Sequence, residues 1–224
     1  MDAMHHGDEH APGGRRRPPR AIVLVMAEYG VGDSPLWYRG SSEDVGLVDP
    51  DADGLGLSAA LRHDLEAWND VFDALSGTSF EWPSAAVRDA HRVDAFTLAS
   101  RVQLEVGDDV HVWCGAGSGI DTFPVAHPVV VAPADRVGTE VESWNGRRRA
   151  EIMSARAAGL REGTARAIVG WRALTERAGG PFGDAGTRAL GLRTAARMQG
   201  DVGVRAQVVS FAGASGPYTL ADVD

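Results

Sequence analysis

The stretch AIVLVMA at residues 21–27 is the segment from which the fold of this chain can be worked out. It is short, apolar at every position and rich in β-branched residues. Runs of this kind, bounded by turn-forming residues, are typical of a strand that is buried on both faces. The stretch therefore predicts a strand in the interior of the molecule.

Downstream of this strand, the pattern changes from turn formers to two helices. Residues 28–57 are rich in Gly and Pro, and Ser58 then has the character of a helix N-cap. Apolar residues recur at helical spacing behind it, at Leu61, Leu65, Trp68, Phe72 and Leu75, before Gly77. A second helix is predicted from about Ser84 to Val106, ended by Gly107, and a second strand at VHVWC, residues 110–114. The order strand, loop, helix, helix, strand predicts an α/β or α+β unit.

The whole chain of 224 residues divides into four segments by composition. Residues 1–20 lack apolar periodicity and predict a disordered tail, and residues 21–114 form the α/β unit. Residues 115–138 form a Gly- and Pro-rich connector, in which VAHPVVVA has room for a strand. Residues 139–224 predict a mainly helical unit, with helices at about 139–157, 161–178 and 184–198 and a strand in VRAQVVSF. No internal repeat is visible in the sequence.

The composition excludes several kinds of chemistry. All 22 basic residues are Arg, so the chain has no lysine for a Schiff base, for pyridoxal phosphate or for a phosphate-binding loop. Cys114 is the single cysteine, which excludes disulfides within the chain and predicts a cytoplasmic protein. No apolar run approaches the roughly 20 residues of a membrane-spanning helix, so we expect no membrane partner.

Charge is distributed unevenly between the two units. Residues 21–132 contain five Arg and 18 acidic residues, a net charge of −13, whereas residues 133–224 contain 13 Arg and 10 acidic residues, a net charge of +3. This difference predicts two units with different surroundings.

The loop EYGVGDSPLWYRG at residues 28–40 has two interpretations. A loop that leaves the end of a buried strand is a common place for a ligand, and Glu28 and Arg39 would then be its polar groups. Alternatively, the loop covers the core, with Trp37 buried against the helix that carries Trp68 and Phe72. The sequence favours the second interpretation, because no further polar cluster accompanies Glu28 and Arg39.

The segments EYG, PLW and VDPDADGLGLSAALRHDLEAWNDVF give residues 21–113 a family resemblance. They resemble the opening of small α/β proteins from high-GC bacteria that have no assigned activity. The resemblance implies no reaction and no site residues, and it does not extend to the second unit.

The stretch SARAAGLREGTARAIVGWRAL at residues 154–174 resembles the helix-turn-helix of bacterial regulators. Gly159 would take the turn, and the second helix would bury Leu160, Ile168 and Trp171. Its exposed side would present four residues to DNA: Arg161, Thr164, Arg166 and Arg172. An ordinary helical hairpin explains the same pattern and is the favoured interpretation, because such short motifs match often by chance.

Three other motifs are incomplete, and they predict neither a cofactor nor a metal. The stretch CGAGSG at 114–119 follows a strand, but its third glycine comes one residue early for a dinucleotide loop. The stretch DPDADG at 49–54 begins like a calcium loop, yet Ala60 stands where a bidentate Glu is needed. The histidines show no metal-ligand spacing, and His91 is predicted to be a hydrogen-bonded, partly buried side chain.

These observations favour a non-enzymatic binding or regulatory protein that acts through contacts with macromolecules, either a protein partner or further copies of itself. Sequence-specific DNA binding through residues 154–174 is the alternative. A small-molecule enzyme with its site at residues 28–40 is a third interpretation, for which no catalytic residues are identified.

Overall fold

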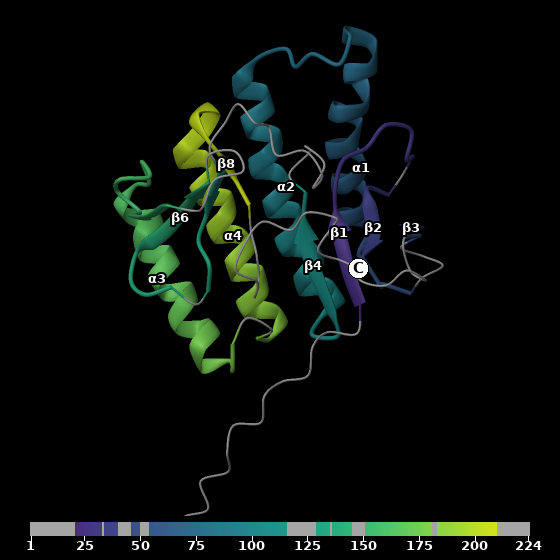
Figure 1. The fold of residues 1–224 in the computed structure, drawn as a ribbon. Helices are drawn as coiled ribbons and strands as arrows, with labels where there is room; N and C mark the ends of the chain where they lie inside the picture. The colour runs from purple at the N-terminus through teal and green to yellow at the C-terminus, as the bar shows by residue number, and fades with distance from the viewer. Residues whose placement is uncertain are drawn as a thin grey trace, which may run out of the picture.

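The computed structural model describes residues 21–32, 34–39, 46–49, 54–115, 129–134, 136–144, 151–180 and 183–209. Within these ranges the chain forms two four-stranded mixed sheets and four α-helices, so the predicted α/β or α+β class is confirmed. The four helices lie side by side in the order α1, α2, α4, α3 (Figure 1). The predicted tail and most of the predicted connector lie outside the described residues, as do Asp51 and Asp53.

The first unit has the predicted order of strand, helix, helix and strand, with two further strands in the segment predicted as a loop. Its elements are β1 (Ala21–Val25), β2 (Leu36–Arg39), β3 (Gly46–Leu47), α1 (Ala59–Asp73), a 3-10 helix η1 (Ala74–Thr78), α2 (Ala85–Val106) and β4 (Val110–Cys114). The sheet order is β3-β2-β1-β4, with β2 antiparallel and β4 parallel to β1.

Local sequence signals explain both helices of this unit. Ser58 and Ser84 are the N-caps, and their hydroxyl oxygens accept hydrogen bonds from the backbone N–H groups of Leu61 and Val87. Gly107 follows α2 at a φ of +73°, a conformation that favours glycine. Helix α1 ends at Asp73, earlier than predicted, because the chain tightens into η1 before it reaches Gly77.

The second unit departs from the prediction at its start. The predicted helix at 139–157 is wrong, since β6 (Glu140–Trp144) and β7 (Glu151–Ser154) pair there as antiparallel strands. Val141 and Glu142 are both buried, and backbone pairing with β5 on one side and β7 on the other holds this segment as a strand. The other elements are β5 (Val129–Val131), α3 (Glu162–Arg177), α4 (Ala185–Val202), a 3-10 helix η2 (Gly203–Arg205) and β8 (Gln207–Val208).

The two units have the same topology, so the expectation of no internal repeat is wrong at the level of the fold. The second sheet has the order β7-β6-β5-β8, again with one antiparallel and one parallel neighbour of its first strand. Gln103 and Gln199 occupy equivalent positions and are both fully buried. The amide nitrogen of each donates to two backbone carbonyls in the turn after its helix. The amide oxygen of each accepts from the N–H of Val112 or Val208, at 2.9 Å in both units.

The two units share one hydrophobic core through α2 and α4, which pack along each other. Small side chains such as Ala95, Ala99 and Ala195 are buried within this core. Arg188 of α4, which is 6% exposed, crosses to the first unit. Its guanidinium donates to the side-chain oxygen of Gln103 at 3.1 Å and to three backbone carbonyls, those of Gly107, Asp108 and Val110.

No helix in the described part of the chain combines the length and the apolar character needed to cross a membrane.

Candidate functional site

A groove of about 440 Å³ lies between α1 and α2 and opens to solvent. Trp68, His91 and Leu98 are buried residues along it, whereas Val71 and Val87 are 46% and 38% exposed. Two carboxylates, Asp64 and Asp94, also line the groove. The groove therefore combines an apolar surface with acidic groups.

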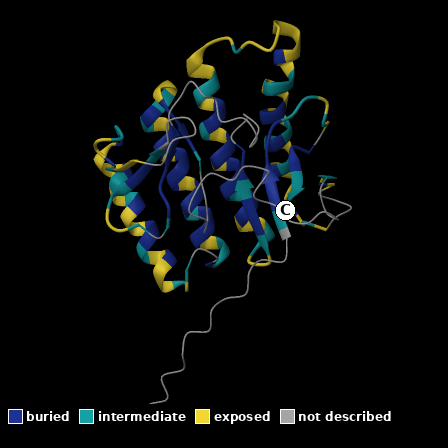
Figure 2. Cartoon of the chain, in the orientation of Figure 1, coloured by how far each residue is buried: buried dark blue, intermediate teal, exposed yellow. Residues whose placement is uncertain are grey.

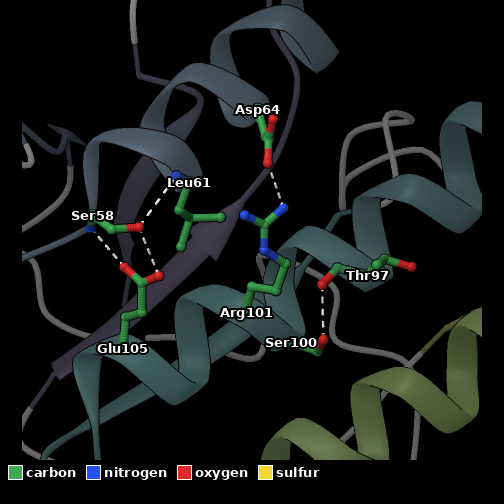
Figure 3. Close-up of polar contacts among 7 residues, drawn as sticks. All are labelled: Ser58, Leu61, Asp64, Thr97, Ser100, Arg101 and Glu105. Carbon is green, nitrogen blue, oxygen red and sulfur yellow. Dashed lines mark hydrogen bonds and ion pairs between the residues drawn. The ribbon is translucent and has the colours of Figure 1, made fainter.

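One end of the groove is held by polar contacts between the two helices (Figure 3). Arg101 of α2 donates to Asp64 of α1 at 2.6 Å. Glu105 of α2 accepts from the backbone N–H of Ser58 at 2.7 Å and from its hydroxyl at 2.9 Å. These contacts tie the start of α1 to the end of α2, so the spacing of the helices is fixed there.

His91 and Trp68 lock the middle of the groove by a reciprocal pair of hydrogen bonds. The His91 Nε2 atom lies 3.0 Å from the Trp68 carbonyl oxygen, and the Trp68 indole N–H donates to the His91 carbonyl at 2.9 Å. The two rings stack with their centroids 4.6 Å apart. Nε2 faces a carbonyl and must carry the proton, so Nδ1 is an acceptor, and it has no hydrogen-bond partner among the described residues. His91 is 4% exposed, which confirms the prediction of a hydrogen-bonded histidine and places it deeper than expected.

Burial keeps two histidines of the first unit neutral. The pKa of His91 falls to about 4, mainly because burial disfavours the imidazolium. The pKa of His111 also falls to about 4, again mainly through burial, with a smaller contribution from the charge of Arg188.

Acidification from pH 7 to pH 5 is expected to lower the free energy of unfolding by about 2 kcal/mol for each of these histidines. Each folded-state pKa lies below the unfolded value of 6.5, so the unfolded chain binds the proton first and stability is lost as the pH falls from 6.5 towards 4. Urea denaturation at both pH values measures the loss. His91→Gln should remove about half of the pH dependence. His63→Gln, at a solvent-exposed position of α1, should leave it unchanged. If the free energy of unfolding of His91→Gln depended on pH as that of the original chain does, the lowered pKa of His91 would be contradicted.

Aromatic side chains continue from the groove to the turn between α1 and α2. Tyr29 lies 4.6 Å from Phe72 and 5.1 Å from Phe80, measured between ring centroids, and Trp82 lies 5.0 Å from His91. Phe80 is 63% exposed, on a turn that is largely exposed in Figure 2. Ser79 and Phe80 both have a positive φ, +57° and +64°, which costs about 1 kcal/mol or more for each non-glycine residue. The turn thus places the Phe80 side chain at the surface although its backbone conformation is energetically unfavourable.

The electrostatic balance of this unit is strongly acidic. Residues 21–114 contain five Arg and 17 acidic residues, a net charge of −12. Of the two groove carboxylates, Asp64 is paired with Arg101. No ion pair or hydrogen bond to Asp94 is found within the described ranges, and burial raises the pKa of its carboxyl group. Among the described residues, Asp94 is therefore the groove carboxylate that has no cation beside it.

The structure separates the two residues that were predicted to form a ligand site in the 28–40 loop. Arg39 pairs with Ile22 at the start of β1, whereas Glu28 follows the end of that strand and its backbone N–H donates to Asn69. The two side chains therefore belong to opposite ends of the β1–β2 pair. Trp37 is also placed differently from the prediction. It is partly exposed, donates to the Met26 carbonyl at 3.2 Å, and lies beneath the guanidinium of Arg39 at 5.8 Å.

The predicted helix-turn-helix at 154–174 is wrong, because this segment contains one helix. Ser154 ends β7, a turn with Gly159 at a φ of +79° follows, and α3 begins at Glu162. The residues before Gly159 cannot form a first helix, since those up to Ser154 pair with β6 and the N–H of Ala155 bonds to the Thr139 carbonyl.

The four residues predicted to face DNA do not form a common exposed surface. Thr164 and Arg172 are only 4% and 6% exposed, and Arg172 donates to the carbonyls of Pro133, Gly138 and Glu140. Arg161 is exposed and ion-paired with Asp201, and Arg166 lies 3.9 Å from Glu162. These hydrogen bonds of Arg172 connect α3 to the β5–β6 turn. The sequence pattern did not reveal this structural role.

The equivalent place in the second unit is packed differently. Trp171 of α3 corresponds to Trp68 of α1, since each is a buried Trp three residues after a buried aliphatic residue. The Trp171 indole lies directly against Gly191 of α4, where an added Cβ would be 2.8 Å from the indole nitrogen. Trp171 therefore fills the space beside α4 in the second unit. The groove with an acidic and aromatic lining is described between α1 and α2 of the first unit.

Comparison with known protein families gives a match to the first unit. Residues 21–114 match the model of a family described as Serratia CdiI immunity protein-like. The match covers less than half of the chain and ends with β4. It supports neither the resemblance to proteins of high-GC bacteria nor that to helix-turn-helix regulators. Searches of curated proteins and of solved structures find no match.

Proposed function

We propose that this chain is an immunity-type protein, which binds a toxic protein partner and holds it inactive. The observation that carries the proposal is the match of residues 21–114 to an immunity protein-like family. A match of this kind supports binding to a protein and does not support binding to DNA.

The surface of the first unit supports the same proposal on physical grounds. Protein interfaces gain most of their affinity from a few aromatic or arginine anchors, surrounded by polar groups. Phe80 is an exposed aromatic side chain of this kind. Its ring contacts the ring of Tyr29, and its backbone N–H donates to the Leu75 carbonyl, so its position is held. The acidic charge of the unit repels nucleic acid and attracts a basic protein.

The test is co-expression of the full chain with each candidate toxin encoded beside its gene, in a host whose growth the toxin alone arrests. We expect growth to be restored and the two proteins to elute together in size-exclusion chromatography. Phe80→Ala should weaken the complex by about 30-fold, the effect of losing an interface anchor of roughly 2 kcal/mol.

A matched control is Leu104→Ala, because Leu104 is 49% exposed on α2 and does not line the groove. This variant should bind and protect as the original chain does. The proposal fails if no neighbouring toxic product is neutralised while the chain is present and folded.

A further inference from the structure

We propose that the groove between α1 and α2 receives an arginine- or lysine-bearing segment of the protein partner, with Asp94 as the carboxylate that pairs with its cation. This inference rests on the proposed function, because it names the chemistry of the partner at that surface.

The groove offers a hydrogen-bond acceptor, so a ligand that binds there is expected to supply a hydrogen-bond donor. Asp94 is an acceptor, and the described residues supply no cation to it. The Nδ1 atom of His91 also has no partner among the described residues, but it is itself enclosed, so Asp94 is the acceptor that a side chain in the groove can reach. Arginine has five N–H donors and lysine has three, and neither has an acceptor. A cationic side chain therefore complements the Asp94 carboxylate, to which the described residues supply no cation.

The apolar surface of the groove fits the rest of such a side chain. Val71 and Val87 are exposed, and Ala67 and Ala90 leave room between the helices. Arginine and lysine carry aliphatic stems that pack on apolar surface while the charged end stays at a polar group. A purely apolar ligand would bury Asp94 without a partner, which is unfavourable.

The histidine in the groove does not oppose a cation. His91 is neutral at pH 7, because its pKa is lowered to about 4, so it contributes no positive charge. Arg101, the cation at the end of the groove, is already neutralised by Asp64 at 2.6 Å. With a net charge of −12, the unit also attracts a basic partner from a distance.

The experiment measures the binding of two synthetic helical peptides to the full chain by fluorescence anisotropy. The peptides share one leucine face and carry either arginine or glutamate at their polar positions. We expect the arginine peptide to bind and the glutamate peptide not to bind. Asp94→Asn should weaken the arginine peptide by about tenfold, as expected for the loss of a partly desolvated charge pair.

Two further variants separate the groove from general charge attraction. Asp109→Asn removes the same charge from the α2–β4 turn, outside the groove, and should change the affinity by less than about twofold. Ala90→Arg places a cation four residues before Asp94 on α2, so it should keep the fold and abolish peptide binding.

Three results would overturn the inference: equal binding of both peptides, equal effects of Asp94→Asn and Asp109→Asn, or unchanged binding by a folded Ala90→Arg variant. The growth assay reports on the proposed function separately. If a toxin is neutralised but the groove variants have no effect on the peptide or on protection, the groove assignment fails and the immunity role stands. If the peptide binds as expected but no toxin is neutralised, the proposed function fails.

Discussion

Replacement of Arg188 by methionine is expected to lower the free energy of unfolding by about 3–5 kcal/mol. The Arg188 guanidinium is buried and donates to the Gln103 side chain and to carbonyls on both sides of the boundary between the two units. Methionine fills a similar volume but donates nothing, so several buried oxygens would lose their partners. Urea denaturation followed by circular dichroism measures the loss.

Arg193→Met provides the matched control for this variant. Arg193 is an exposed residue of the same helix, and its replacement should change stability by less than about 0.5 kcal/mol. Equal stabilities of the two variants would show that Arg188 does not hold the units together.

Replacement of Trp68 by alanine is expected to cost about 3–5 kcal/mol, the usual effect of removing a buried aromatic side chain. Trp68 is 6% exposed, stacks on His91 and donates its indole N–H to the His91 carbonyl. The variant would lose packing, leave that carbonyl without its side-chain donor and open the middle of the groove. Denaturation midpoints in urea measure the effect.

Trp37→Ala is the informative comparison, since it removes the same side chain from β2. Trp37 is partly exposed and makes one indole hydrogen bond, so its loss should cost only about 1 kcal/mol. Side chains alternate along a strand, so Leu36 and Tyr38 pack into the core with the helices while Trp37 points to the other face. A larger loss for Trp37→Ala than for Trp68→Ala would contradict this arrangement.

The helices of the first unit were predicted well because their signals are local. A serine N-cap, apolar residues at helical spacing and a terminal glycine act within a few turns of one helix, so Ser58, Ser84 and Gly107 mark real boundaries. Strands β2 and β6 were missed because each gains its hydrogen bonds from a partner elsewhere in the chain. Without that partner, LWYR and EVESW have no local property that separates them from a loop or a helix.

The repeat of the fold was also invisible in the sequence. The two units share an arrangement of elements, but their equivalent residues have diverged, as with Asn69 and Arg172, which lie one residue after Trp68 and Trp171. Both side chains bond to the turn after the first strand of their unit, Asn69 as an acceptor and Arg172 as a donor. A shared structural role filled by opposite chemistry leaves no pattern that sequence comparison within the chain can detect.

The sequence by itself therefore determined the fold class, the helices of the first unit, the acidic charge of that unit and the absence of lysine chemistry. Only the tertiary structure decided the second sheet, the repeat, the burial of Thr164 and Arg172, and the groove where Asp64, Asp94 and His91 meet. The reason is the range of the forces involved. Helix caps, periodicity and net charge act locally or add up along the chain, whereas strand pairing and a surface between two helices exist only after distant segments have packed.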